Sequence, residues 1–241
     1  PIRTFDYTSF NLGGIYKPNS KLRLNLNVSS GWRAPSVNEL YSNGLHHGIG
    51  AIERGDKNLG TEKSLSAIST LNFNHKKLSL ELSAYTYSFR NFIYYQPSGK
   101  AELTIRGAFP VFLYQQNNAN ISGADATLLY ALFRGVDVKL NAMLVRGRNT
   151  ELKNNLLYMP ADRLQLFISL KAKDGRKFRD LYVEPNLLYV AKQIRVQPGV
   201  DYAEAPEAYL LFGLNAGTSL LLGKQWLILN FSISNAANTV Y

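Results

Sequence analysis

Apolar and polar residues alternate along much of this chain. Residues 21–28 read KLRLNLNV, which places Leu22, Leu24, Leu26 and Val28 on one face of an extended segment and the intervening polar residues on the other. An alternation with a period of two over this length is typical of a β-strand with one apolar and one polar side. Ten segments share the pattern: residues 8–18, 21–32, 62–74, 77–94, a strand within 111–133, 136–146, 162–171, 181–194, 208–222 and 225–235. The pattern predicts an all-β protein.

The connections between these segments alternate between two kinds. Turns at residues 18–20, 75–76, 134–135, 172–179 and 223–224 are mostly short, whereas those at 33–60, 95–110, 147–160 and 195–207 are longer and more varied. Short turns at one rim and long polar loops at the other are typical of an antiparallel up-and-down meander of the outer-membrane β-barrel kind. The longest connection, 33–60, stands between two regularly alternating strands and is the first place to look for function.

Aromatic residues gather beside the predicted long-loop end, where an interfacial girdle of a membrane barrel belongs. They are Tyr85, Tyr87, Phe89, Phe92, Tyr94, Tyr95, Phe109, Phe112 and Tyr114. Tyr85 and Tyr87 break the parity of Leu78, Leu80 and Leu82, which leaves two alternatives: a bulge near Ala84, or tyrosines that face the lumen. A soluble β-sandwich with core aromatics is the competing fold, although it has less use for such long strands.

Composition removes several classes of protein. The 241 residues contain no cysteine, so neither disulfides nor cysteine metal sites are available. The net charge of +10 comes from Lys and Arg scattered through strands, turns and loops, without the basic stripe that nucleic-acid binding requires. No run approaches the about 20 consecutive apolar residues of a membrane helix, whereas a barrel strand needs only about 10, every second one apolar.

Four segments resemble the barrel of the TonB-dependent outer-membrane receptors. They are GWRAPSVNELYSNGLHHG at 31–48, GDKNLGTE at 55–62, YQQNNANISGAD at 114–125 and SISNAANTVY at 232–241. The resemblance implies that residues 1–241 are part of a 22-stranded transmembrane barrel, without the family's globular plug domain and without its final strand. Ten strands cut from a barrel leave two raw edges, so edge-to-edge self-association of this piece is expected.

Enzyme motifs are missing from the sequence. There is no nucleophile elbow, P-loop or His-Glu-x-x-His, and the three histidines are His46, His47 and His75. No catalytic residue and no resident cofactor are therefore expected.

His46 and His47, in the 33–60 loop, are the sharper candidates for binding. With Glu39 and Glu53 they offer nitrogen and oxygen ligands for a transition metal or its complex. Neighbouring side chains in an extended loop point in opposite directions, which argues against both histidines holding one ion, and ordinary solvated loop histidines are the alternative. Arg33 and Pro35 are predicted to have structural roles where the preceding strand stops.

The resemblance implies active import across the outer membrane of a Gram-negative bacterium. In that scheme the partners are outer-membrane lipid, a cargo of metal, haem or siderophore, and the TonB complex acting through the plug domain; nucleic acid is not a partner. The resemblance leaves zinc, haem and ferric siderophore open as cargo. A passive porin and a surface all-β adhesive or structural module are the alternative functions.

Overall fold

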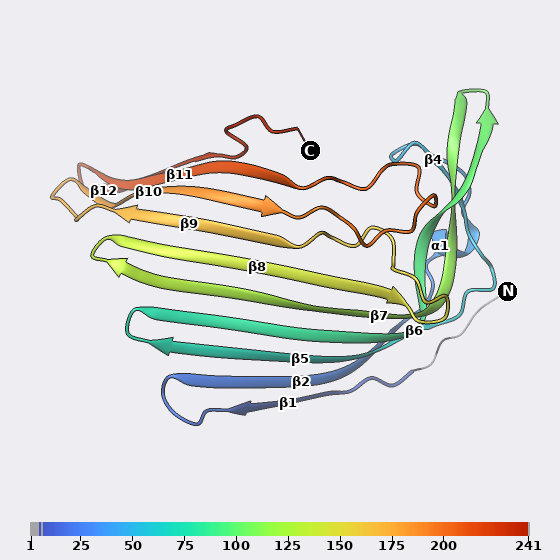
Figure 1. The fold of residues 1–241 in the computed structure, drawn as a ribbon, viewed down its shortest axis with the longest axis horizontal. Coiled ribbons are helices and arrows are strands. Elements are labelled where there is room, and N and C mark those ends of the chain that lie inside the picture. The colour runs from blue at the N-terminus through green and yellow to red at the C-terminus, as the bar shows by residue number, and fades with distance from the viewer. Residues whose placement is uncertain (1–4, 6, 241) are drawn as a thin grey trace.

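The strands of the computed structural model form one continuous antiparallel sheet. The structure describes residue 5 and residues 7–240, so the outermost residues of the predicted 1–241 domain lie outside it. Along the sheet the order is β1-β2-β5-β6-β7-β8-β9-β10-β11-β12, a meander in which each strand pairs with the next of the ten (Figure 1). Strands β3 and β4 form a separate hairpin, and β4 pairs in parallel with β7.

The element bounds match the alternating segments of the sequence closely. The ten strands of the meander are β1 Asn11–Tyr16, β2 Leu22–Arg33, β5 Glu62–His75, β6 Leu78–Thr104, β7 Gly107–Phe133, β8 Val136–Asn149, β9 Arg163–Lys171, β10 Phe178–Val190, β11 Tyr209–Leu222 and β12 Gln225–Ile233. Within the 33–60 connection lie α1 Val37–Tyr41, β3 Asn43–His46 and β4 Ala51–Arg54. The all-β prediction is confirmed. No described helix is long and apolar enough to cross a membrane.

The pairing register puts most of the leucines of these strands on the same side of the sheet, which we call the leucine face. One row across the sheet runs through Leu24, Leu71, Leu82, Ala126, Ala142, Leu164, Tyr189 and Leu210. The neighbouring row, on the opposite or polar face, runs through Asn25, Thr70, Ser83, Asp125, Met143, Arg163, Val190 and Tyr209. Side chains alternate between faces along every strand, so a continuous register keeps one face apolar throughout.

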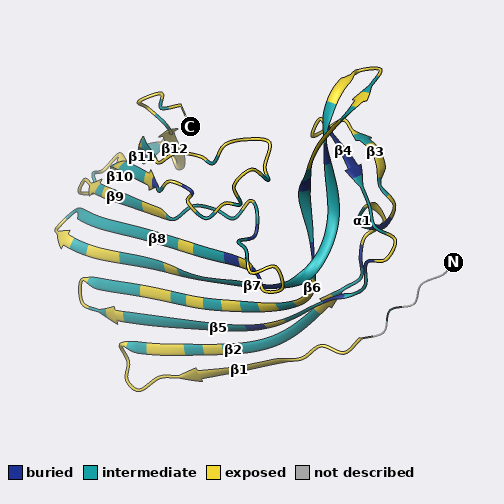
Figure 2. Cartoon of the chain, turned by 45° about the vertical axis from the view of Figure 1, so that its right-hand side comes forward, coloured by how far each residue is buried: buried dark blue, intermediate teal, exposed yellow. Residues whose placement is uncertain are grey.

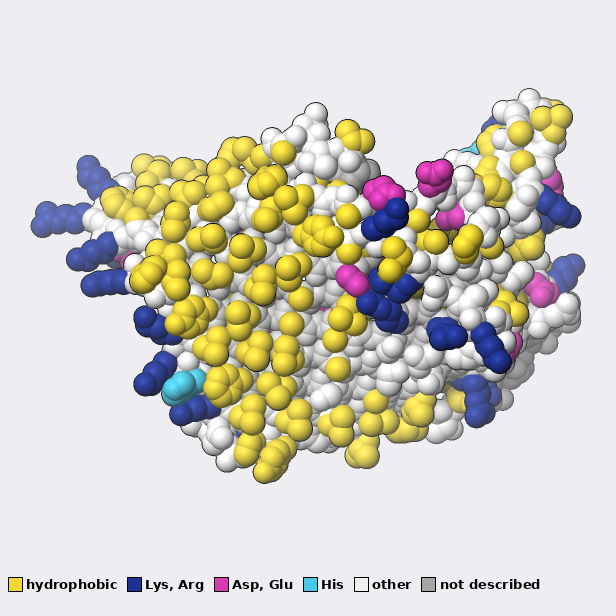
Figure 3. Space-filling view, in the orientation of Figure 1, with side chains coloured by type: hydrophobic (Ala, Val, Ile, Leu, Met, Phe, Trp, Pro, Cys, Tyr) yellow, Lys and Arg dark blue, Asp and Glu magenta, His cyan; other side chains and the backbone are white. Residues whose placement is uncertain are grey.

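The leucine face is open. Leu26 is 53% exposed and Leu229 is 45% exposed, and yellow side chains cover most of this face in Figure 3. All described strands belong to one sheet, so no second sheet covers it, as one would in the sandwich alternative. The buried apolar residues gather instead at the loop end of the strands (Figure 2). They are Leu40, Ala51, Ile52, Leu59, Ile93, Val111, Ala119, Leu156 and Val190.

Two predictions about β6 and β7 need correction, and one of the two alternatives for Tyr85 and Tyr87 is excluded. Residues 95–110 are not a loop, because β6 and β7 continue as a paired hairpin to Thr104 and Gly107. Pro97, Ser98 and Gly99 read as loop residues in the sequence, but a register shift between Pro97 and Ala101 accommodates them inside the hairpin. The strand predicted to end at residue 94 is therefore ten residues longer.

The second correction concerns the aromatic girdle, because three of its predicted residues do not lie on the leucine face. The excluded alternative is the bulge near Ala84. Pairing is continuous through Ala84, so no bulge occurs there, and the register shift lies between Phe89 and Phe92. Tyr85, Tyr87 and Phe89 consequently lie on the polar face of the sheet, whereas Leu82 of the same strand lies on the leucine face. Of the two alternatives, polar-facing tyrosines are what the structure shows. Tyr85 lies over Gly123, where an added Cβ would meet its hydroxyl oxygen at 2.4 Å.

Candidate functional site

The connection after β2 is held in place by an arginine clamp. Arg33 ends β2 and donates hydrogen bonds to Glu39 in α1 at 2.9 Å and to Glu62 at the start of β5 at 3.1 and 3.2 Å. Pro35 is buried two residues further along. Ser36 caps α1 through a reciprocal capping box with Glu39. Arg33 and Pro35, for which the sequence predicts structural roles, thus lie where β2 ends and the connection begins.

The clamp also sets the charge of Glu39. Burial alone would raise the pKa of this carboxyl, but the hydrogen bonds and charge of Arg33, with the bonds from Ser36, hold it below its ordinary value. Only 13% of the Glu39 side chain is exposed. Glu39 is thus an ionised carboxylate whose two oxygens accept hydrogen bonds from Arg33 and from the Ser36 amide.

The β3–β4 hairpin carries the histidine pair. His46 Nδ1 lies 2.8 Å from Glu53 Oε1, whereas His47 Nδ1 accepts a 3.4 Å hydrogen bond from Arg106 at the tip of the β6–β7 hairpin. The Glu53 side chain is 10% exposed and that of His46 is 53% exposed. The two imidazoles therefore have different partners. Among residue 5 and residues 7–240, no group of three or more His, Asp or Glu side chains is placed to hold a metal ion.

Aromatic rings surround the buried end of Glu53. Tyr95 stacks on Phe112 with ring centroids 4.5 Å apart, and its ring lies 5.1 Å from that of Tyr114. Tyr202, from the connection between β10 and β11, reaches Phe112 at 5.4 Å, and its hydroxyl lies 2.6 Å from the Lys100 carbonyl oxygen. Burial, and then the charge of Glu53, raise the pKa of both Tyr95 and Tyr114. We call Tyr95, Phe112, Tyr114 and Tyr202 the tyrosine cluster.

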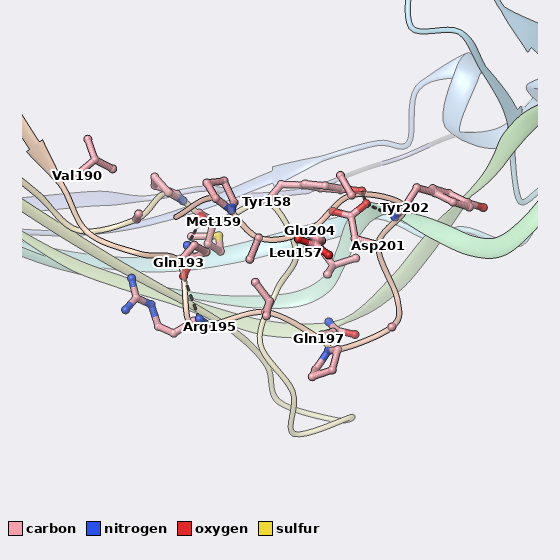
Figure 4. A pocket seen from close by; sticks show the side chains of 18 of the residues that line it. Leu157, Tyr158, Met159, Val190, Gln193, Arg195, Gln197, Asp201, Tyr202 and Glu204 are labelled. Carbon is pink, nitrogen blue, oxygen red and sulfur yellow. Dashed lines mark hydrogen bonds between the residues drawn. The ribbon is translucent and has the colours of Figure 1, made fainter. Parts of the chain in front are cut away.

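A pocket of about 650 Å³ opens between the connections that follow β8 and β10 (Figure 4). Gln193 closes one side of it by donating a 2.6 Å hydrogen bond to the Met159 carbonyl oxygen. Tyr158 donates to Asp201 at 3.1 Å across the gap between the two segments. Tyr202 also lines this pocket, so it belongs to both the pocket and the tyrosine cluster. The volume is in the range of small-molecule sites, and the lining combines rings with carboxylates and amides.

Three connections and one extended hairpin therefore meet at one rim of the sheet. The four predicted site residues all lie in the 33–60 connection; the structure joins His46 to Glu53, and gives Glu39 and His47 arginine partners. Sequence reasoning missed Tyr158, Gln193, Asp201 and Tyr202. Their only signal was the aromatic and polar content of two long loops, because their contacts with other segments join residues that are 34 to 102 positions apart.

This architecture, a one-sided antiparallel sheet with long connections at one rim, matches a known family. A family model described as TonB dependent receptor-like, beta-barrel, covers residues 1–236. The chain belongs to the TonB-dependent receptor family. Its antiparallel strands match the barrel domain of that family.

Solved structures with the same fold include receptors of this family. The copper transporter OprC superimposes with a TM-score of 0.74 at 16% identity, covering 94% of this chain and 33% of OprC. The ferric enterobactin receptor PfeA from Pseudomonas aeruginosa gives 0.67 at 18% identity, covering 95% and 34%. The siderophore receptor PirA from Acinetobacter baumannii gives 0.66 at 14% identity, covering 95% and 36%. The chain spans about a third of the length of these proteins, and likeness at this identity shows the fold alone.

Proposed function

We propose that this chain forms part of the wall and outer rim of an outer-membrane receptor that imports a metal or a metal complex. The observation that carries the proposal is the leucine face, which is continuous over the meander and open to the surroundings. Water would penalise such a face at about 25 cal/mol per Å² of apolar surface, whereas lipid tails would cover it. In this proposal the loop rim faces the exterior, and the TonB complex supplies energy through a plug domain.

His46 is the residue we assign to the cargo. When Nδ1–H of His46 donates a hydrogen bond to the Glu53 carboxylate, Nε2 of the neutral ring carries the lone pair and the ring is held in one orientation. Glu53 adds a negative charge at the edge of the tyrosine cluster, where a cationic or aromatic-bearing complex finds both an acid and ring surfaces. Glu39 and His47 shape the loop through their arginine partners. Candidate cargoes are zinc, haem and a ferric siderophore.

Equilibrium binding to the full-length protein tests this assignment. Zinc, haem and a ferric catecholate complex are titrated into the wild-type protein and into the variants His46→Ala/His47→Ala and Glu53→Gln. The cargo that binds wild type should bind both variants roughly tenfold to hundredfold more weakly, since one charge-assisted contact is worth about 1–3 kcal/mol. His75→Ala is the matched control, because His75 pairs with Leu78 at the short-turn rim. Equal binding by all of these proteins would contradict the assignment.

A passive porin is the second candidate function, favoured by the polar face of the sheet. Import through a porin continues when the proton gradient is collapsed, whereas import driven by TonB stops. Uptake of the bound cargo by cells treated with a protonophore therefore distinguishes the two. Continued uptake at the untreated rate would favour the porin.

A further inference from the structure

The leucine face changes character abruptly near the loop rim. On β8 the side chains that follow Leu144 on this face are Arg146 and Arg148. On β6, Arg90 stands on the same face and pairs in register with Lys63 of β5. Lys and Arg side chains gather at this edge of the yellow surface in Figure 3. We call Lys63, Arg90, Arg146 and Arg148 the basic belt.

Acidic partners do not neutralise the basic belt. Arg146 donates to Asp162 at 2.6 and 2.8 Å, but Arg195 shares the same carboxylate at 2.9 Å, which leaves one positive charge over. Arg90 and Arg148 are exposed and form no ion pair among the described residues. An anion that approaches this edge of the apolar face therefore meets guanidinium groups with donors to spare.

A groove in the leucine face lies next to the belt, because Leu144, which lines the groove, is followed on this face of β8 by Arg146. Small side chains at Ser69, Ala84 and Ala124 pair across β5, β6 and β7 in one row that continues to Leu144. They form the floor of a groove of about 570 Å³ whose walls include Leu82 and Leu144 and whose far end reaches Asp162. The lining is almost wholly apolar, so the groove suits a hydrocarbon chain rather than a polar ligand.

We propose that a net-anionic phospholipid, whose phosphate carries no choline or other cationic group, binds at this place, with an acyl chain in the groove and its phosphate on Arg146 and Arg148. The inference rests on the proposed membrane location of the leucine face. Guanidinium groups bind phosphate through paired, charge-assisted hydrogen bonds. Asp162, which pairs with Arg146, also lines the groove, so the apolar surface for a lipid tail begins next to that guanidinium group. An acidic protein would satisfy the arginines but leave the groove empty.

The test uses the delipidated full-length protein in a neutral detergent, followed by native mass spectrometry during titration with dimyristoyl phosphatidic acid. The same titration with dimyristoyl phosphatidylcholine and with inorganic phosphate separates headgroup charge, tail and free anion. Phosphatidic acid should bind at least about tenfold more tightly than either, the equivalent of one net charge-assisted contact. Equal affinity for the two lipids, or binding of inorganic phosphate as tight as that of phosphatidic acid, would overturn the proposal.

Two variants locate the site. Arg146→Gln/Arg148→Gln leaves Asp162 paired with Arg195, and Ala124→Phe fills the groove; each should weaken phosphatidic acid binding by about tenfold. Lys224→Gln, in the turn between β11 and β12, and Leu229→Phe, elsewhere on the leucine face, are the matched controls and should bind as wild type does. If the first two variants also bind as wild type does, the proposed site is wrong. Outer-membrane fractionation of the wild-type protein is measured in parallel, so that failure of the membrane proposal is seen separately from failure of the lipid site.

Discussion

Replacing Arg33 with Met should loosen the 33–60 connection without unfolding the sheet. The substitution keeps much of the side-chain volume but removes the donors to Glu39 and Glu62, whose side chains are only 13% and 11% exposed. A charge-assisted interaction contributes about 1.5–3 kcal/mol to stability. If the paired hydrogen bonds to each carboxylate are counted as one such interaction, loss of both carboxylate partners has a ceiling of about 3–6 kcal/mol. Because 41% of the Arg33 side chain is exposed, water can replace part of that interaction, and about 2–3 kcal/mol is the expected local cost.

Hydrogen–deuterium exchange of the full-length protein measures this loss of local stability at individual amides of the 33–60 connection. The amides of Gly55 and Asp56 donate to Ser42 and Glu39 carbonyls, both at 2.8 Å, and so report on closure of the loop. A local loss of about 2–3 kcal/mol corresponds to exchange roughly 30-fold to 150-fold faster at these amides. Arg23→Met on the same strand is the control, since within the described part of the chain the Arg23 side chain donates a hydrogen bond only to Asn25, two residues along. Unchanged protection at Gly55 and Asp56 in Arg33→Met would refute the clamp.

Two further predictions follow from the same structure. The pKa of Glu39 is lower in the folded protein than its ordinary value. The contribution of Glu39 to loop closure is therefore present above pH 4.5 and is lost as the pH falls through the folded pKa. Hydrogen-exchange protection of the loop, corrected for intrinsic exchange, should decline in that acid range and should decline less in Glu39→Gln. Gly123→Ala should destabilise the sheet by about 1–3 kcal/mol in denaturant unfolding because its methyl group would overlap Tyr85 and the Leu144 carbonyl, whereas Gly14→Ala, with nothing within 4 Å, should be nearly neutral; equal stability of both variants would contradict the predicted crowding.

The strands could be predicted because their pattern is local. In each alternating segment, such as 21–28 or 136–146, the sequence itself indicates which side chains share the apolar face. Short turns such as Gly223-Lys224 indicate where a strand ends. The prediction was wrong where local signals conflict. Pro97, Ser98 and Gly99 resemble a loop, yet cross-strand pairing carries the chain through them, and only the partner strand reveals this.

The site was less predictable because it is built from contacts between loops. The His46–Glu53 contact had a local signal, since Gly48 and Gly50 are turn residues between two short segments, 43–46 and 51–54, which pair as a hairpin. Tyr202 had only the composition of its loop as a signal, because its contacts with Phe112 and with the Lys100 carbonyl depend on how the connection after β10 approaches the β6–β7 hairpin. A single sequence gives the composition of such loops but does not show which segments, distant in the sequence, they contact.

Lipid contact along one strand tests the central claim, that the leucine face lies against the membrane. Spin labels are placed singly at residues 24, 25, 26 and 27 of β2 in the full-length protein reconstituted into liposomes, and their collision rates with oxygen and with a water-soluble nickel complex are measured. Oxygen concentrates in hydrocarbon, so we predict high oxygen accessibility at Leu24 and Leu26 and low accessibility at Asn25 and Asn27, matching the register that places them on opposite faces. Equal oxygen accessibility at all four positions, or the opposite alternation, would contradict the account.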